Sequence, residues 1–271
     1  MKLTKNTLPD YFEIASPKNS HYTTETNTFD FVDRQSDVLL VTIGDSWTWG
    51  ADLTPNDDED FRKTHVFGNL LSTSLNTDWL NLALSGSNNF FIAERAEQLG
   101  KIVDQLDYKN IYMVCTFTEV GRSFDSHHDN YIDYIEWFNN NHIDNFLGFL
   151  NAECARRIKK VADEHKIKLI VGTNFIDAVG IDANVLLPTP WFRLLGIECL
   201  DNVYAGSTGV TRLQATEQFV NDTNSYKQWM IELITKAKCV DKLCQSSKLI
   251  KQHPTVDAHR LWADYILENI K

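Results

Sequence analysis

Four short apolar segments, each followed by a longer amphipathic one, constrain the fold of this chain more than any other feature. The amphipathic segments repeat apolar residues at the spacing of a helix face, most clearly over residues 142–166. Strands that alternate with helices in this way pair in parallel, and both faces of their sheet are covered. We therefore predict an α/β protein with a central parallel sheet. Its four predicted strands are residues 37–43, 79–84, 111–117 and 167–174.

The chain is predicted to form one domain with an arm and an insertion. Residues 1–35 are polar and irregular but carry several aromatic side chains, so we expect an N-terminal arm that packs on the domain. Residues 36–271 are expected to form the single domain, because no linker or repeat divides them. Its insertion is expected around residues 176–245, which prolines and glycines interrupt, with a short fifth strand near 197–203. Thr255 is a suitable N-cap for a closing helix.

The composition of the chain limits which classes of partner the protein is expected to bind. The formal net charge of −11 disfavours nucleic acid and anionic membranes, which would repel it. No apolar run has the roughly 18 residues that a membrane span needs, and the first residues lack the apolar segment of a signal peptide. We therefore expect a cytoplasmic protein, or one that is exported by a route other than a cleaved signal peptide. The cysteines and histidines lack disulfide or metal-ligand spacing, so neither a metal nor another cofactor is expected.

The first apolar segment runs directly into Gly44-Asp45-Ser46. A glycine followed by two short polar residues allows the chain to leave a sheet in a sharp turn. Ser46 is then expected at the carboxyl end of a parallel strand, which is where open α/β sheets bind ligands. We expect its hydroxyl to be exposed to substrate, near the start of the next helix. The loop lacks the further glycines and the lysine that cradle a phosphate, so nucleotide binding is not expected.

Two later segments supply groups that serine chemistry requires. The segment Asn81–Gly86 ends the second predicted strand, and His253-Pro254-Thr255 precedes the closing helix. A serine nucleophile needs a base that takes its proton and donors that stabilise the oxyanion of the intermediate. Together with Gly44-Asp45-Ser46, these segments resemble the GDSL or SGNH family of serine hydrolases. The resemblance extends over most of residues 37–270.

The resemblance implies a three-layer α/β/α fold with a five-stranded, flavodoxin-like parallel sheet. It also implies hydrolysis or transfer of an acyl ester, in which Ser46 attacks and His253 is the general base. The backbone N–H groups of Ser46 and Gly86 would then bind the oxyanion, and His259 would be structural. An alternative makes His259 the base with Asp257 nearby. It is less favoured, because residues with a spacing of two on a helix point in different directions.

Two positions depart from the pattern of that family. The family has an asparagine oxyanion donor after the third strand, where this chain has Thr118. The Thr118 hydroxyl can donate one hydrogen bond, and Asn88 or its neighbour Asn89 could supply a replacement donor. The family also has its triad acid three residues before the histidine, where this chain has Ile250. The imidazole would then be oriented by a backbone carbonyl, in a Ser–His dyad, or by another carboxylate, with Asp257 and Glu119 as candidates.

The expected substrate is a small acyl group on a carbohydrate. Aromatic rings stack on sugar faces, and a rim of aromatic side chains is expected around the site. The competing hypothesis is a catalytically weak domain that binds a glycan or serves as a structural subunit, because two family positions are changed. The expected rim consists of Trp47, Trp49, Tyr131, Trp137 and Trp191, and the candidate substrate-binding residues are Asp45, Trp47, Glu119 and Arg122.

Overall fold

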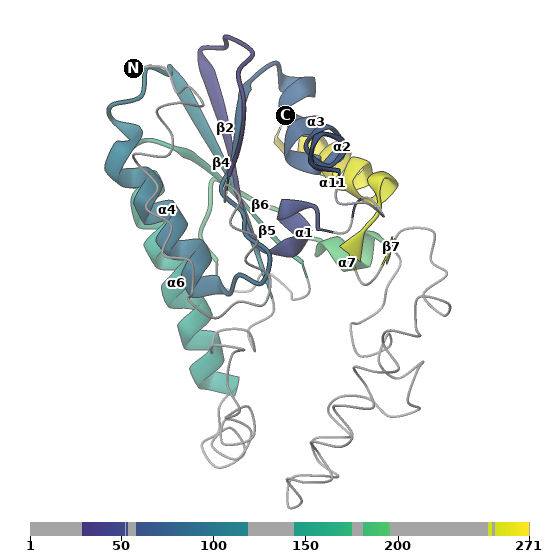
Figure 1. Ribbon diagram of the computed structural model, residues 1–271. Helices are drawn as coiled ribbons and strands as arrows, with labels where there is room; N and C mark the ends of the chain where they lie inside the picture. The colour runs from purple at the N-terminus through teal and green to yellow at the C-terminus, as the bar shows by residue number, and fades with distance from the viewer. Residues whose placement is uncertain are drawn as a thin grey trace, which may run out of the picture.

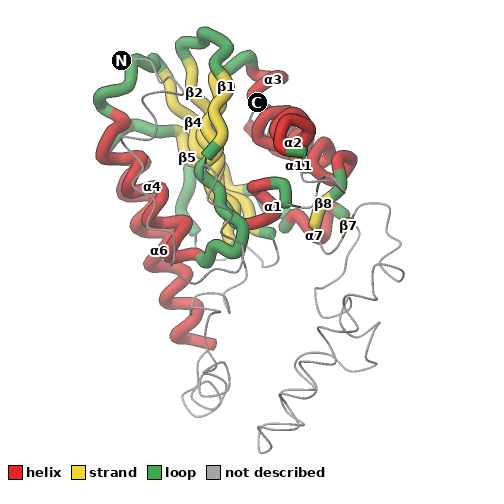
Figure 2. Tube along the Cα trace, viewed as in Figure 1, coloured by secondary structure: helices red, strands yellow, loops and turns green. Residues whose placement is uncertain are grey.

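The computed structural model has a central six-stranded sheet with helices on both faces (Figure 1). Figure 2 shows the strands running between the two helical layers. The three-layer α/β/α architecture that the resemblance implies is thereby confirmed. The described residues are 29–51, 53, 58–118, 144–174, 181–195, 249–250 and 253–270.

The six strands are β1 (Asp30–Val32), β2 (Val38–Ile43), β3 (Asp78–Asn81), β4 (Asn110–Phe117), β5 (Lys168–Thr173) and β6 (Val185–Leu186). Their order across the sheet is β1-β3-β2-β4-β5-β6. β1 is antiparallel to β3, and every other neighbouring pair is parallel. The five parallel strands therefore have the flavodoxin-like order that was expected. β2 lies where successive connections leave the sheet in opposite directions, which is the position that such sheets use for ligands.

The helices divide between the two faces of the sheet. One face is covered by α4 (Asn89–Val103) and α6 (Asp144–Glu164). The opposite face is covered by α1 (Ser46–Trp49), α2 (Glu59–His65), α3 (Phe67–Leu75), α7 (Trp191–Leu194) and α11 (Val256–Ile270). A small second sheet of β7 (Leu249–Ile250) and β8 (His253–Pro254) precedes α11. Thr255 caps α11 as predicted, because its hydroxyl accepts a hydrogen bond from Ala258 N–H at 3.4 Å.

β2 is buried on both faces, as expected for a central parallel strand. Leu40 faces the layer of α3 and α11, and the three residues that alternate with it face α4 and α6. Those three residues are Leu39, Val41 and Ile43, and all four side chains are fully buried. The strand that leads to Ser46 is therefore packed from both sides.

The sheet differs from the predicted one at its two edges. β1 lies inside the predicted N-terminal arm and pairs with β3, with Phe31 opposite Leu80. A strand of three residues is too short to show a clear alternation, so the sequence pattern did not reveal it. At the other edge the fifth parallel strand is β6, which pairs with β5 inside the predicted insertion. The range 197–203, where that strand was expected, lies outside the described residues, as do residues 1–28 of the arm.

A buried ion pair connects β1 to the helical layer that carries α1. The guanidinium of Arg62 donates two hydrogen bonds to the Asp30 carboxylate, at 2.8 and 2.7 Å. Asn81 donates to the same carboxylate at 3.2 Å. Arg62 also donates to the carbonyl oxygen of Trp49 at 3.0 Å. The pair thereby joins the edge strand to the end of the short helix that begins at Ser46.

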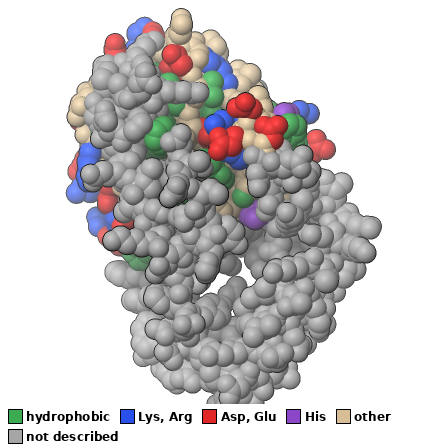
Figure 3. Space-filling model, in the orientation of Figure 1, with side chains coloured by type: hydrophobic (Ala, Val, Ile, Leu, Met, Phe, Trp, Pro, Cys, Tyr) green, Lys and Arg blue, Asp and Glu red, His purple; other side chains and the backbone are tan. Residues whose placement is uncertain are grey.

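Charged side chains of both signs are interspersed on the described part of the face in Figure 3. The longest described helix, α6, pairs several of its own charges at helical spacing. None of the helices in the described ranges is both long and apolar enough to cross a membrane.

Replacing Arg62 by Ala is expected to destabilise the fold strongly, because Asp30 would be left as a buried carboxylate without its main partner. The free energy of unfolding, measured by urea denaturation, should fall by about 3–5 kcal/mol. The matched control is Lys109→Ala, which removes an exposed ion pair with Asp37 and should leave the urea midpoint unchanged. Equal midpoints for the two variants would contradict the structural role of the buried pair.

Candidate active site

Ser46 is the first residue of α1, a single helical turn that begins directly after β2. Asp45 is its N-cap, and the Asp45 carboxylate accepts a hydrogen bond from Trp47 N–H at 3.0 Å. Gly50 ends the turn with a left-handed φ of 84°, and its N–H donates to the Ser46 carbonyl oxygen at 3.0 Å. Caps at both ends therefore define the position of Ser46. The backbone N–H of Ser46, as one of the first in a helix, has no acceptor within that helix.

Gly44 lies where no side chain would fit. A Cβ atom at this position would overlap the hydroxyl groups of Thr48 in α1 and Thr116 in β4. These two hydroxyl groups also form a hydrogen bond with each other. The close approach brings the turn that carries Ser46 against β4, and it requires a residue without a side chain. This contact is the physical reason for the glycine of the Gly-Asp-Ser motif.

Ser46 is buried, which corrects the expectation of an exposed hydroxyl. Only 4% of its surface is accessible. An exposed residue was expected because turns usually lie at the surface. Here α1 packs against the strand ends on one side and contacts β8 on the other. A reactant therefore has to reach Ser46 below the surface of the molecule.

The segment after β3 runs beside the Gly-Asp-Ser motif, as its sequence predicts. Leu82 N–H donates to the Thr42 carbonyl oxygen at 2.8 Å, and Leu84 N–H donates to the Gly44 carbonyl oxygen at 3.1 Å. Gly86 then has a φ of 82°, a value that favours glycine. A Cβ atom at Gly86 would meet no other atom within 4 Å. The predicted glycine turn therefore begins next to Gly44 and has open space beside it.

Thr118 follows β4 and is fully buried. Its backbone N–H and carbonyl oxygen both bond to the side chain of Asn89, at 3.0 and 3.2 Å. The Thr118 hydroxyl has no hydrogen-bond partner among the described residues. Asn88, the other candidate donor, is the N-cap of α4, and its side-chain oxygen accepts from Phe91 N–H at 2.9 Å. The cap uses the Asn88 oxygen and not its amide N–H groups, so Thr118 and Asn88 both remain candidate donors.

Asn174, which the sequence did not single out, lies directly after β5 and is fully buried. Its side-chain amide donates to the Asp45 carboxylate at 2.7 Å. Its backbone N–H donates to the Phe117 carbonyl oxygen at 2.8 Å and continues the pairing of β4 with β5. The sequence offered one signal, which was the position of this residue: a polar residue at the end of a predicted parallel strand lies at the carboxyl edge of the sheet, where ligands bind.

A cluster of buried rings joins α1 to the C-terminal part of the chain. We call it the aromatic cluster. Trp191 of α7 is at its centre. Each pair of aromatic rings stabilises the fold by about 0.5–1.5 kcal/mol beyond the effect of burying its apolar area. The cluster therefore holds α7 and α11 against α1 and α3. Ring centroids lie 5.3 Å from Trp191 for Trp47, 5.4 Å for Phe67, 5.0 Å for His259 and 5.2 Å for Trp262.

The predicted aromatic rim is wrong for two of its members. Trp47 is 3% exposed and Trp191 is fully buried. Neither ring can stack on a sugar, and Trp47 is therefore not a substrate-binding residue. The single turn of α1 directs Trp47 into the core, where large aromatic rings bury the most apolar area. Trp49 is half-buried, with the Arg62 guanidinium 3.8 Å from its ring centre. Tyr131 and Trp137 lie outside the described residues.

His253 is half-buried in β8. β8 contacts α1 and leads directly into α11, so the fold brings Ser46 and His253 into the same region from opposite ends of the domain. β8 pairs with β7 in antiparallel orientation, and Ile250 is the residue opposite His253. The position at which the resembled family has its acid is therefore directly across from the histidine.

His259 is fully buried in α11. Its Nδ1 accepts a hydrogen bond from Phe67 N–H at 3.2 Å, so the neutral ring carries its proton on Nε2. Burial, and secondarily the charge of His253, lowers the pKa of His259 to about 3. A ring that is enclosed and stays neutral fits the predicted structural role. The alternative in which His259 is the base loses support, because its partner Asp257 is exposed at the start of α11.

The group that orients the His253 ring stays a prediction. Glu119 and Arg122 lie outside the described residues. Within the described ranges, no group of three His, Cys, Asp or Glu side chains is arranged to hold a metal ion. Burial raises the pKa of the Cys115 and Cys154 thiols, to about 11 for Cys154. Both thiols therefore stay protonated at neutral pH and are poor nucleophiles.

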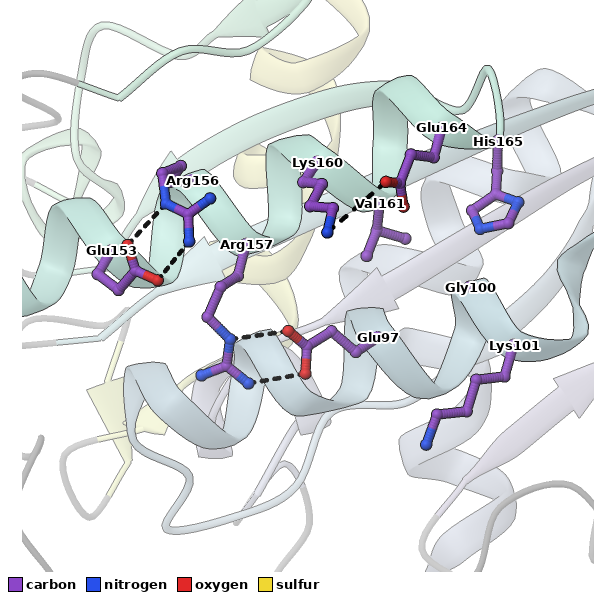
Figure 4. A pocket seen from close by; sticks show the side chains of 10 residues that line it. All are labelled: Glu97, Gly100, Lys101, Glu153, Arg156, Arg157, Lys160, Val161, Glu164 and His165. Carbon is purple, nitrogen blue, oxygen red and sulfur yellow. Dashed lines mark hydrogen bonds and ion pairs between the residues drawn. The ribbon is translucent and has the colours of Figure 1, made fainter.

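A charged surface groove lies between α4 and α6, on the face of the sheet opposite to α1 (Figure 4). Its main charges pair with each other across and along the two helices. Arg157 pairs with Glu97 at 2.7 Å, and Arg156 pairs with Glu153 at 2.6 Å. Because these charges are compensated and the groove is on the other face, it is not part of the candidate site.

Comparison with known proteins gives loose structural matches. No protein-family model matches the sequence, and no curated protein is detectably similar to it. One solved structure that matches is a member of the lipolytic protein G-D-S-L family from Veillonella parvula. It is 14% identical, with a TM-score of 0.39 over 85% of this chain and 97% of that chain.

Two further matches are also described as hydrolases. A family two carbohydrate esterase from Clostridium thermocellum, in complex with cellohexaose, is 10% identical, with a TM-score of 0.39 over 86% of this chain and 63% of that chain. A lipase from a goat rumen metagenome is 11% identical, with a TM-score of 0.36 over 86% of this chain and 97% of that chain. At these identities and scores, the chemistry of this chain has to be argued from its own residues.

The buried His259 is expected to make stability depend on pH below neutrality. Its pKa is about 3 in the folded protein and about 6.5 when unfolded. Between these values the unfolded chain binds a proton that the folded chain does not. The stabilisation is complete above pH 6.5 and is lost as pH falls toward 3, by about 1.4 kcal/mol per pH unit. Urea denaturation at several pH values should show this slope in the wild type.

The control for this slope is His259→Gln, which keeps a group that can accept from Phe67 N–H but does not titrate. Carboxylates that titrate in the same range contribute equally to both proteins, so the difference between the two slopes isolates His259. Identical slopes would show that His259 does not remain neutral in the folded state.

Proposed function

We propose that the chain is a serine hydrolase of the GDSL type, which hydrolyses or transfers an acyl ester with Ser46 as nucleophile and His253 as general base. The observation that carries the proposal is the contact between α1 and β8 at the carboxyl edge of the sheet. Two short motifs from opposite ends of the domain meet at that contact. Motifs that resembled the family by chance would have no reason to be neighbours in the fold.

The proposed reaction has two steps. His253 takes the proton of the Ser46 hydroxyl while the oxygen attacks the ester carbonyl carbon, and the carbonyl becomes an oxyanion. The N–H groups of Ser46 and Gly86 and the hydroxyl of Thr118 are the proposed donors to that oxyanion. The intermediate then expels the alcohol, which receives the proton from His253. Water or a second alcohol, deprotonated by His253, then attacks the acyl-enzyme. The acyl group leaves Ser46, and His253 returns the proton to the Ser46 oxygen.

The way His253 is oriented is part of the proposal. A base is effective when a third group fixes its ring and its tautomer. Ile250 is opposite His253 in the ladder and has no polar side chain. The imidazole would then be oriented by a backbone carbonyl, in a Ser–His dyad, or by a carboxylate from elsewhere in the chain. Asp257 and Glu119 remain the candidate acids for an atypical triad.

The burial of Ser46 supports a small acyl group. With 4% of its surface accessible, the residue leaves little room for a long acyl chain beside it. The half-buried polar side chains of Ser85 and Asn88, on either side of the exposed Gly86, support a hydroxylated alcohol such as a sugar. A short acyl ester of a carbohydrate is therefore the substrate class that we propose.

Replacing either proposed catalytic residue is expected to abolish most of the activity. Hydrolysis of p-nitrophenyl acetate and of an acetylated sugar should fall by about 10²–10⁴-fold in His253→Ala, because the general base is lost. Ser46→Ala should also fail to react with a serine-directed fluorophosphonate, which is measured by intact-protein mass spectrometry. p-Nitrophenyl palmitate should be a poor substrate of the wild type if the acyl site is small.

The matched controls are Ser74→Ala in α3 and His165→Ala directly after α6. They remove a serine and a histidine that are remote from α1. Both should keep wild-type activity. If the wild type is no faster than Ser46→Ala and His253→Ala, and the phosphonate does not label Ser46, the chain is not a serine hydrolase. A glycan-binding or structural domain would then be the better description.

Restoring an acid opposite His253 is expected to raise activity. In an antiparallel pair, directly opposite residues have Cβ atoms about 4.5–5.5 Å apart, so Ile250→Asp brings a carboxylate next to the imidazole. The carboxylate would orient the ring and stabilise its protonated form, so kcat should rise and the acidic limb of the pH profile should move to higher pH. A tenfold gain corresponds to about 1.4 kcal/mol of barrier.

The matched control is Ile250→Asn, which has nearly the same shape as the aspartate but carries no charge. Steady-state kinetics of both variants between pH 5 and 9 separates the effect of charge from that of polarity. If Ile250→Asp and Ile250→Asn have the same kcat and the same pH profile, the histidine opposite residue 250 is not the general base.

A further inference from the structure

The N-terminal end of α1 is held by a side chain from two strands away in the sheet. Asn174 follows β5, whereas Asp45 follows β2, and β4 lies between them. The Asn174 amide nevertheless reaches the Asp45 carboxylate at 2.7 Å, and both residues are fully buried. The backbone of Asn174 is fixed in turn by its hydrogen bond to Phe117. The contact therefore connects the turn that carries Ser46 to the rigid centre of the sheet.

The Asp45 oxygen that Asn174 contacts is also the oxygen that caps α1. Asp45 Oδ1 accepts from Trp47 N–H at 3.0 Å and from the Asn174 amide at 2.7 Å. A helix of four residues does not persist by its own hydrogen bonds, so its geometry depends on its caps and on tertiary contacts. A buried carboxylate also has to be satisfied by donors to stay in place. Asn174 is one of the donors to that carboxylate, on the same oxygen that caps α1, and it thereby supports the cap.

We propose that Asn174 is a positioning residue for Ser46, which acts by holding the Asp45 carboxylate in its capping geometry. The inference rests on the proposed function of Ser46. Asn174 does not touch the reacting atoms in this proposal. It determines where α1 begins, and therefore where the Ser46 hydroxyl lies relative to His253. A displacement of about 1 Å at a reacting group is enough to lower a rate by about 10²-fold.

The variant that tests this role is Asn174→Asp, which keeps the shape of the side chain but replaces a donor by a titratable group. Two carboxylates at hydrogen-bond distance cannot both be ionised, so the pair retains one proton to a raised pH. While that proton is present, residue 174 still donates to Asp45. Once it is lost, the two charges repel, and Trp47 N–H loses its acceptor. The activity of the variant relative to wild type should be close to one at pH 4.5 and fall by about 10–10²-fold by pH 9.

Because the activity of the variant is divided by that of wild type at the same pH, the effects of other titrating groups in this region cancel. The described elements packed against α1 carry further charged or titratable groups, among them His253 of β8, Arg62 of α2, Arg193 of α7 and the neutral His259 of α11. All of these groups are present in both proteins. Thr116 and Thr118, which come from β4, do not titrate. A fall in the ratio with rising pH is therefore specific to the pair of carboxylates.

Two further variants separate positioning from folding. Asn174→Ala removes the donor at every pH, so its activity should be reduced by a constant factor, with kcat affected more than KM. Asn184→Asp is the matched control, because Asn184 only accepts a hydrogen bond, from Leu169 N–H at 2.7 Å, and an aspartate can accept it equally well. That variant should follow the wild-type pH profile. Thermal melts of all variants identify any that do not fold.

The outcomes distinguish this inference from the proposed function. If wild type is active and the ratio for Asn174→Asp is independent of pH, the positioning role is refuted while the hydrolase proposal stands. If wild type neither turns over esters nor reacts with the fluorophosphonate, the hydrolase proposal fails. The hydrogen bond between Asn174 and Asp45, and its support of the α1 cap, is then tested by the NMR signal of the Trp47 amide. A signal that shifts with pH in Asn174→Asp but not in wild type supports it, and the same pH dependence in both overturns it.

Discussion

The packing of Trp191 between α1 and α11 is the interaction on which the candidate site depends. Ser46 lies near the start of the domain in the sequence, and His253 lies near its end. Strand β8 nevertheless contacts α1, because α11 is docked beside it. Trp191 contacts Trp47 of α1 on one side and His259 and Trp262 of α11 on the other. One buried ring is therefore shared by the two halves of the site. A cavity at this position would act on the approach of His253 to Ser46 as well as on stability.

The turn that carries Ser46 is too short to define its own geometry, and the fold supplies contacts at both of its ends. Asp45 and Asn174 fix the first end, and Arg62 binds the carbonyl oxygen of Trp49 at the other. Arg62 is itself held by Asp30 of the edge strand. These hydrogen bonds link the polar residues below the surface to one another, although Asn174 Oδ1 has no hydrogen-bond partner among the described residues. They make a rigid support for one hydroxyl group.

The positions that differ from the resembled family lie around this support and not within it. Gly44 and Asp45 have close contacts that explain their residue types. Thr118 and Ile250 are changed, and these are the positions of an oxyanion donor and of the acid behind the base. In the proposed reaction, the Ser46 hydroxyl would be well positioned, whereas the stabilisation of the charge that develops during the reaction would be reduced.

Local patterns in the sequence determined the strands β2 to β5, the helices α6 and α11, the Thr255 cap and the place of Ser46 just after β2. Each of these follows from neighbouring residues, because apolar periodicity and cap chemistry act over a few positions. Only the tertiary structure decided that Trp47 and Ser46 are buried, that β1 forms an edge of the sheet and that Asn174 holds Asp45. Those contacts join residues far apart along the chain, and their geometry depends on how the sheet and helices pack together, which no local pattern contains.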